Sequence, residues 1–256
     1  MNNLYFLLTA LPELEYPKKP FISRSELNSL IEANISSRER AIFQLYRSWK
    51  DVENIRRMLL DEPFLEGGLY NRGELEDVLR EKVGLPQPVF DYLDRFTTKD
   101  EQLRNFPLLL RTLFHDESQG SSFFNKIMAF EERVRLTLAY VRAHHKVADG
   151  TITPLESDEE DPFIEELLSI QKGSIEIDEP YSDLPALYEA KRYSPFELEL
   201  ALSQWRFKQY AALASDELFS FDQVLLYAVQ FDLLEQIANL ESREGLINVH
   251  QLFEAS

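Results

Sequence analysis

Two adjacent histidines, His144 and His145, are the most obvious candidate metal ligands in this sequence of 256 residues, which has four histidines and no cysteine. Adjacent residues on a helix point about 100° apart, and no H-E-x-x-H pattern or third ligand at helical spacing accompanies them. The lack of cysteine excludes disulfides, thiolate metal sites and a cysteine nucleophile. We therefore interpret the pair as a solvated helix end.

The segment 145–156 has some features of an EF-hand calcium loop, because its fifth, sixth and twelfth residues are Asp149, Gly150 and Glu156. The first and third positions, which need oxygen ligands, are His145 and Val147. A second acidic run, 158–161, precedes a proline and is more typical of a solvated cap at a helix N-terminus. The sequence therefore predicts no metal-binding residue.

Patterns for nucleotide binding and catalysis are equally missing from the sequence. Neither G-x-x-x-x-G-K-[ST] nor G-x-G-x-x-G occurs, and no G-x-S-x-G elbow presents a serine nucleophile. Paired carboxylates for acid–base chemistry cannot be chosen among 45 acidic residues without a pocket. We predict no catalytic residue and no cofactor, and expect that the protein is not an enzyme.

The charge of the chain limits its partners. The formal net charge is -18, so a nucleic-acid backbone or an anionic bilayer would be repelled unless basic residues were segregated. The first apolar run, 4–11, lacks a basic flank and a cleavage site and is shorter than the ~20 residues that span a bilayer. We expect a cytoplasmic protein with no nucleic-acid partner and no direct membrane insertion, whose association with a membrane would require a complex.

Acidic residues concentrate in one stretch. Residues 151–190 hold twelve Asp and Glu against one Lys, so 12 minus 1 accounts for 11 of the 18 net negative charges. We predict an acidic connector over 151–190, with one helix at about 162–171, between helical regions 1–150 and 191–256 of one continuous fold.

A basic face stands out against this acidic background. Between residues 37 and 60 there are six cations and three acids. Two interpretations stay open: pairing inside the molecule, for example with the acidic connector, which we favour slightly, and a face that docks a partner. Our candidates for such a partner interface are Arg38, Arg47, Arg56 and Arg57.

Helices are expected to position these residues, because glycine, which favours turns and bulges, is scarce. The chain has only eight glycines among 256 residues, a share well below the usual ~7%. Apolar residues at three-and-four spacing predict long helices over about 37–60, 122–146, 195–214 and 221–242, the last ended by Gly245. Capping boxes are predicted at Ser23, Thr98 and Ser194. The only strand signal covers residues 5–9, so the predicted class is all-α.

Three of the helical segments look like loose copies of one another, at 49–59, 130–142 and 231–240. Each begins with an aromatic residue followed within two positions by an acid. This pattern favours an internal triplication only weakly, because any helical protein offers such matches by chance.

The order of several segments resembles an uncharacterised bacterial family that is encoded with V-type ATPase subunits and is similar to the C subunit of the V/A-type ATPase. The segments that carry this resemblance are 5–12, 49–56, 130–143, 161–168 and 194–202 with Trp205. In that C subunit, an Asp-x-x-Asn helix recurs in three helical units. Asp51 and Asn54 match the first copy, whereas Leu136 and Gln236 stand where later copies would carry the asparagine.

The resemblance implies three loosely repeated helical units around a concave surface. It also implies a non-catalytic role in which the protein couples the central shaft of a V-type ATPase to its membrane ring, with subunits of both as partners. The alternatives are a transient accessory or assembly factor of the same complex, and a helical enzyme whose site the sequence does not reveal.

Overall fold

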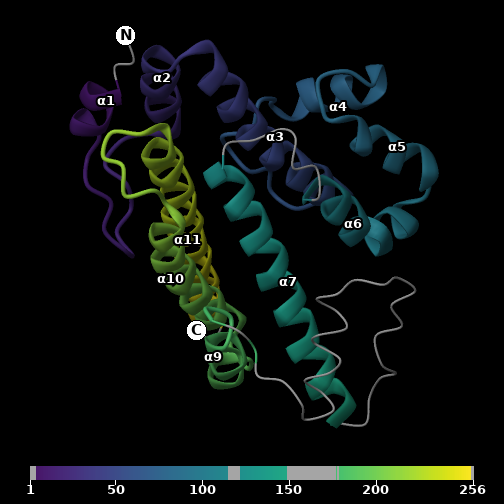
Figure 1. The fold of residues 1–256 in the computed structure, drawn as a ribbon. Helices are drawn as coiled ribbons and strands as arrows, with labels where there is room; N and C mark the ends of the chain where they lie inside the picture. The colour runs from purple at the N-terminus through teal and green to yellow at the C-terminus, as the bar shows by residue number, and fades with distance from the viewer. Residues whose placement is uncertain (1–3, 115–121, 149–176, 178, 255–256) are drawn as a thin grey trace. The chain divides into compact units, whose positions relative to one another are not determined.

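The computed structural model describes residues 4–114, 122–148, 177 and 179–254, which form ten helices and no strand (Figure 1). The predicted all-α class is confirmed for this part of the chain. The chain divides into two compact units: unit 1 comprises residues 1–13, 20–125 and 214–228, and unit 2 comprises residues 14–19, 126–213 and 229–256. The predicted connector stays untested, because most of it lies outside the described residues.

Unit 1 contains six complete helices and the N-terminal ends of two more. The complete helices are α1 (Leu4–Ala10), α2 (Arg24–Asn34), α3 (Ser37–Leu60), α4 (Arg72–Glu81), α5 (Gln87–Arg95) and α6 (Lys99–Phe114), and the partial ones are α7 (Ser122–Ala148) and α11 (Phe221–Glu254). Contacts join α1 to α2, α3 to α6 and α5 to α6. Among the described residues, none of these helices, nor those of unit 2, has both the length and the hydropathy that a membrane crossing requires.

Side chains define the starts of several helices. In the predicted capping box at Ser23, the Glu26 N–H donates to Ser23 Oγ at 3.2 Å and the Glu26 carboxylate accepts from Ser23 N–H at 2.8 Å. The box at Thr98 is also present. At Ser194 the hydroxyl accepts the Glu197 N–H at 3.4 Å, while the Glu197 carboxylate binds Lys191 at 2.6 Å. Each cap satisfies backbone donors that the helix itself leaves unpaired.

The spacing over 37–60 predicts an apolar stripe on α3 made of Ile42, Leu45, Trp49, Val52, Ile55 and Leu59, and the buried face of the helix differs from it. Val52 and Ile55 are buried as expected, but Ile42, Leu45, Trp49 and Leu59 are only half-buried. Phe43 and Tyr46 are buried in their place, and the polar side chains of Asp51 and Asn54 are fully buried for a separate reason. The reason is that the segment after α3 folds back along the helix and offers its backbone groups to these two residues.

A compact apolar core joins α3 to the three helices that follow it in unit 1. Its buried members are Val52, Ile55, Leu75, Leu85, Val89, Phe90, Tyr92, Phe106 and Leu109. Burying such side chains contributes roughly 1.5–3 kcal/mol each, which is the main stabilisation of these short helices. This core fixes the position of α3.

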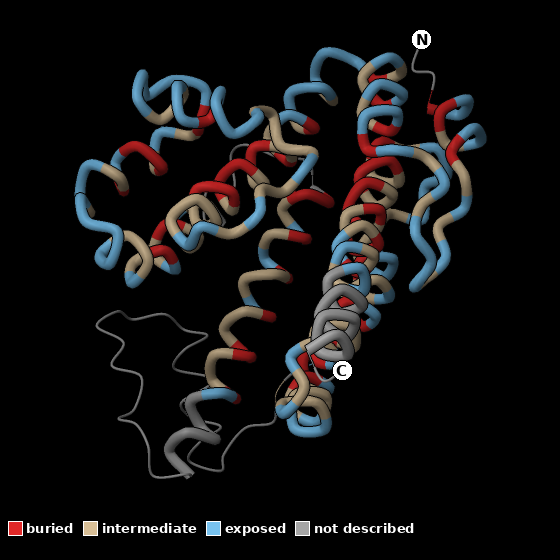
Figure 2. The backbone as a smooth tube through the Cα atoms, turned by 180° about the vertical axis from the view of Figure 1, so that it is seen from behind, coloured by how far each residue is buried: buried red, intermediate tan, exposed pale blue. Residues whose placement is uncertain are grey.

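Unit 2 is built from most of α7, α9 (Asp183–Lys191), α10 (Pro195–Leu213) and the rest of α11. The apolar residues at core spacing in the predicted helix 122–146 are Phe124, Ile127, Phe130, Val134, Leu138 and Val141, and all six are buried on α7. Figure 2 shows buried segments recurring along this helix. Contacts join α9 to α10, and Gln230 Nε2 of α11 donates to the Phe207 carbonyl of α10 at 3.0 Å. Trp205 of α10 lies in the core of this unit, since it is 7% exposed.

A mixed aromatic and ionic cluster ties α7 to α10 in unit 2. The Phe130 ring stacks on Trp205 with centroids 5.3 Å apart. Beside it, Arg206 Nε donates to the Glu131 carboxylate at 3.0 Å, and the Tyr210 hydroxyl donates to the same carboxylate at 2.6 Å. Burial and the Glu131 charge raise the pKa of Tyr210 well above its usual value, so the phenol stays a proton donor.

Three expectations about elements need correction. Residues 5–9 lie in helix α1 and not in a strand. Helix α11 continues through Gly245 to Glu254, because an isolated glycine costs a helix only about 1 kcal/mol. Helix α9 was not predicted, and the helix predicted at 162–171 lies outside the described residues.

Candidate protein-binding surface

The predicted interface residue Arg47 is committed to contacts within unit 1. Its Nε and Nη2 donate to the carbonyls of Gly67 and Gly68 at 3.2 and 2.6 Å. Its Nη1 binds Glu32 of α2 at 2.7 Å. With 17% of its side chain exposed, Arg47 holds the segment after α3 in place and offers little to a partner.

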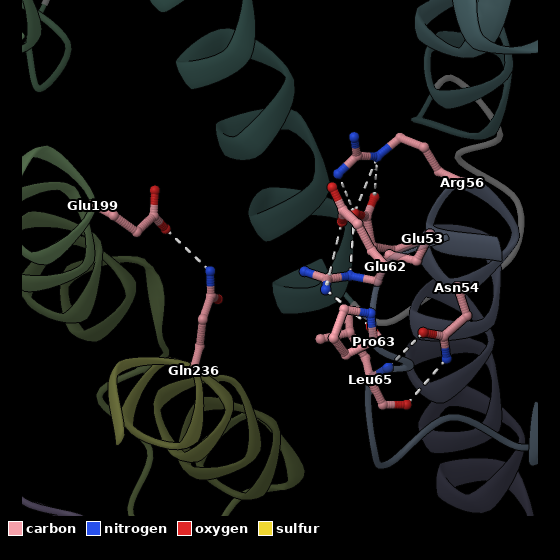
Figure 3. A network of polar contacts seen from close by, with 9 residues as sticks. Glu53, Asn54, Arg56, Glu62, Pro63, Leu65, Glu199 and Gln236 are labelled. Atoms are coloured by element: carbon pink, nitrogen blue, oxygen red, sulfur yellow. Dashed lines mark hydrogen bonds and ion pairs between the residues drawn. The ribbon is translucent and has the colours of Figure 1, made fainter. Parts of the chain in front are cut away.

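Arg56 and Arg57 are also committed to contacts within unit 1, and Figure 3 shows Arg56 beside Glu53. Arg56 Nη2 binds the Glu53 carboxylate at 2.6 Å. Arg57 Nη1 donates to the Pro63 carbonyl at 3.1 Å, and Arg57 lies 3.7 Å from the carboxylates of Glu53 and Glu62. The basic face of α3 is therefore used largely inside unit 1, by the loop and neighbouring acids.

Arg38 differs from the other three candidates. It is exposed at the start of α3 and makes no ion pair with any residue that the structure describes. The four arginines thus do not form one exposed surface. A partner contact stays a prediction, and among these four residues Arg38 is best placed to make that contact.

The side chains of Asp51 and Asn54 bind the backbone of the segment 65–70, and we call this arrangement the clamp. The Asn54 amide accepts from the Leu65 N–H at 2.7 Å and donates to the Leu65 carbonyl at 3.0 Å (Figure 3). Asp51 accepts the N–H groups of Leu69 and Tyr70 at 2.8 and 3.3 Å. The resemblance singled out these two residues, and the structure gives them a structural role in holding a loop.

The clamp requires glycine at position 68. A Cβ placed on Gly68 would lie 2.2 Å from Asp51 Oδ1, far inside van der Waals contact. Burial raises the pKa of Asp51 to about 6, although two backbone N–H groups and the charges of Arg47 and Lys50 act to lower it. A raised carboxyl pKa is typical of catalytic sites, but here both oxygens are occupied by backbone donors.

Unit 1 also exposes three aromatic side chains, one of which contacts the other two, and we call them the aromatic cluster. Tyr5 and Phe6 of α1 are 55% and 68% exposed, and Phe219, just before α11, is 40% exposed. The Tyr5 ring lies 4.8 Å from Phe219 and 5.6 Å from Phe6 between centroids. Such grouped exposed aromatics are typical of surfaces that bind another macromolecule.

The exposure of Tyr5 and Phe6 follows from the burial of the opposite side of α1. Leu4 and Leu7, three residues apart, are buried at 6% and 1%, and they anchor the helix to unit 1. This leaves Tyr5 and Phe6 on the solvent side. Thr9 Oγ1 donates to the Tyr5 and Phe6 carbonyls at 2.8 and 3.2 Å, so the helix ends in a defined conformation.

Phe219 has a strained backbone. Its φ is +61°, in the left-handed region that glycine or asparagine adopts at lower cost. A bulky residue there costs roughly 1–2 kcal/mol, and such strain tends to collect at functional positions. Glycine or asparagine at position 219 would avoid this strain, but neither would supply the aromatic ring that contacts Tyr5.

The aromatic cluster was not predicted from the sequence. Had 4–11 been treated as helical, the spacing of Leu4, Leu7 and Leu11 would have separated the buried side from Tyr5 and Phe6. Nothing in the sequence relates Phe219 to Tyr5, because the two are brought together only by the fold.

The other predicted chemical features add no site within the described residues. No group of three or more His, Asp or Glu that could hold a metal occurs there. The side chains of His144 and His145, the EF-hand-like loop from its fifth position on, and the run 158–161 lie outside the described part. A small hollow in unit 1 has no titratable side chain in its lining, which consists of Leu45, Ser48, Trp49, Val52, Pro86, Leu113 and Phe124.

Comparisons with known proteins find uncharacterised relatives. The chain is 25% identical over 261 residues to an uncharacterised protein of Chlamydia trachomatis, with 97% of both chains covered. An uncharacterised protein of Chlamydia muridarum is also 25% identical, over 234 residues and 88% of both chains. No solved structure matches the chain.

A family model decides the relationship. It matches residues 1–254, nearly the whole chain, and no family of V-type ATPase C subunits matches. The expected resemblance to the C subunit is therefore wrong. The chain belongs to the family described as protein of unknown function DUF2764.

Proposed function

We propose that this protein is a non-catalytic component of a larger protein assembly and that the aromatic cluster is its docking surface. The observation that carries the proposal is the joint exposure of Tyr5, Phe6 and Phe219, in which Tyr5 contacts both other rings and none of the three enters the core. Large aromatic rings held at a surface supply most of the energy in many protein interfaces. A group of three such rings on one surface therefore favours an interface.

The rigidity of the support favours the same function. Leu4 and Leu7 bury one side of α1, and the Tyr227 hydroxyl of α11 donates to the Pro12 carbonyl at 2.9 Å. Burial raises the pKa of Tyr227 to about 12. Side chains that are ordered before binding lose less entropy when a partner arrives.

The alternative of a helical enzyme receives less support from the described residues. Asp51, the carboxyl group with the pKa raised to about 6, has both oxygens bonded to backbone N–H groups of the loop. A general base must reach a substrate proton, and this one faces its own chain. We therefore favour protein binding.

The identity of the assembly is a separate question. The prediction of V-type ATPase central-shaft and membrane-ring subunits as partners loses the C-subunit resemblance that motivated it. It stays a prediction, as does the alternative of a transient accessory factor. A stoichiometric component and a transient factor differ in their amount relative to the purified assembly.

Site-specific photocrosslinking in the native host tests the docking surface and names the partner. The full chain would carry 4-benzoylphenylalanine in place of Phe6, which keeps an aromatic ring on the cluster. We expect crosslinks to a protein of another gene, identified by mass spectrometry of the joined peptides. Phe219→Ala in the same chain should reduce the yield about tenfold, as loss of a central aromatic contact does.

Val83 provides the matched control position. It is 64% exposed in unit 1, between α4 and α5, and lies outside the aromatic cluster. The same crosslinker at Val83 should not enrich the partner. Equal labelling from both positions, or no protein adduct from Phe6, would exclude the aromatic cluster as the docking surface.

A further inference from the structure

We infer that the partner presents an apolar segment flanked by lysine or arginine side chains, an inference that rests on the proposed docking function. Two acids lie beside the aromatic cluster. Asp216 and Glu217 directly precede Leu218 and Phe219, and all four residues are exposed. Neither carboxylate forms an ion pair with any described residue, so both are available to a partner.

The two segments that build the surface carry charge of one sign only. Residues 4–12 have no charged side chain, and residues 214–220 have two acids and no base. Leu218 is 77% exposed and extends the apolar area next to these acids. An apolar centre with an acidic edge complements an apolar centre with a basic edge, which is how interfaces select partners and align them.

The acidic edge is held in a defined conformation. The Glu217 N–H donates to Ser215 Oγ at 3.1 Å, and Gln223 Nε2 of α11 donates to the Ser215 carbonyl at 2.7 Å. Ser220 Oγ accepts the Gln223 N–H at 3.4 Å and caps α11. These bonds hold the backbone of the segment that carries the two carboxylates, two and three residues before Phe219, before any partner binds.

Charge also argues against the other occupants of such a surface. A second copy of this chain brings another net charge of -18 and the same two acids to the contact. An anionic bilayer would be repelled by the same edge. The same acids that repel a second copy or an anionic bilayer attract a protein with a basic edge.

The test measures the adduct formed from 4-benzoylphenylalanine at position 6 of the full chain in the native host. The edge variant is D216K/E217K, and the matched control is E76K/E81K, which reverses two exposed acids on α4 of the same unit. We expect the edge variant to lower the adduct at least about fivefold, and the control to change it less than about twofold. The joined partner peptide should contain apolar residues flanked by Lys or Arg.

The edge variant D216N/E217Q removes charge with little change of shape, and it should lower the adduct about threefold. Circular dichroism of each variant checks the fold. Unchanged adduct in both edge variants, or a partner segment without basic residues, would refute the basic partner and leave the docking function standing. An adduct with a second copy, or binding to phosphatidylcholine vesicles that Phe6→Ala abolishes, would refute both, as would the lack of any adduct.

Discussion

The α3 region of unit 1 and the α7 region of unit 2 start from the same sequence pattern and use it differently. In each, an aromatic residue is followed within two positions by an acid. In unit 1 the acid, Asp51, is fully buried and binds backbone N–H groups of the loop after its own helix. In unit 2 the acid, Glu131, binds the side chains of Arg206 and Tyr210 on another helix.

The third segment with this pattern, on α11, differs again. Gln236, at the position where an asparagine was expected, donates from Nε2 to Glu199 Oε1 of α10 at 3.1 Å, in an exposed place (Figure 3). The three segments therefore begin with the same sequence pattern but make different contacts. The pattern marks a helix that makes a polar tie to a neighbour, and the neighbour differs in each case.

The largest effect should come from Gly68→Ala, which tests whether the clamp of unit 1 depends on close backbone approach. The added Cβ would lie 2.2 Å from Asp51 Oδ1, so either the loop moves or the buried carboxylate loses its N–H donors. We expect a loss of about 3 kcal/mol in the free energy of unfolding, measured with urea.

Gly73→Ala is the matched control for that substitution. A Cβ on Gly73 meets only Asn71 Oδ1 at 3.6 Å, an ordinary contact, and Gly73 lies within α4. Alanine there should stabilise unit 1 by about 0.5–1 kcal/mol. A tolerated alanine at position 68 would mean that the clamp is looser than its geometry indicates.

The sequence predicted the helices of this fold better than their buried faces. The spacing along α7 identified its core positions, because apolar residues there face helices that bury them. Along α3 the same reasoning failed at Asp51 and Asn54, which are buried only because a loop brings its own backbone to them. Periodicity reports apolar burial and gives no sign of a polar residue that a loop will satisfy.

The candidate site was harder to predict for a similar reason. Arg47 looked like a docking residue because its charge stands out in an acidic chain, yet its donors are used by the carbonyls of Gly67 and Gly68. The aromatic cluster joins Phe219 to α1 across nearly the whole sequence. Contacts of such separation are set by the packing of helices and loops, which a single sequence does not report.

The next effect is expected in unit 2, where Glu131→Gln tests whether its acid is as important as that of unit 1. The side chains of Glu131 and Arg206 are 24% and 17% exposed, so the substitution leaves a mostly buried guanidinium without its counter-charge. We expect a loss of about 2 kcal/mol in the free energy of unfolding. Gln236→Ala, which removes an exposed tie, should cost less than about 0.5 kcal/mol. Equal costs for the two would contradict the contrast drawn between these segments.

A smaller effect should appear in the pH dependence of stability. Burial raises the pKa of Asp51 to about 6 from its ordinary 3.8, so the folded protein binds the proton more tightly than the unfolded chain. The contribution therefore grows as the pH falls through 6 and is complete below 3.8. Between pH 7 and pH 5 this carboxyl should add about 1 kcal/mol to the free energy of unfolding.

Asp51→Asn isolates that contribution from the many other acids. The difference between wild type and variant, measured by urea unfolding at both pH values, should shift by about 1 kcal/mol in favour of the wild type at pH 5. A difference that does not change with pH would show that Asp51 has an ordinary pKa and that its backbone donors outweigh its burial.

The smallest effect on stability is expected from Phe219→Gly, which separates binding surface from scaffold within unit 1. Glycine relieves the cost of φ +61°, roughly 1–2 kcal/mol, and gives up the contact with Tyr5, so the two changes nearly cancel. We expect a change of less than about 1 kcal/mol, together with a clear loss of crosslinking from Phe6. Lys82→Gly, at φ +53° and without a ring contact, should leave crosslinking unchanged. A loss of more than about 2 kcal/mol for Phe219→Gly would instead place this ring with the core residues, as a part of the fold that is exposed only at its edge.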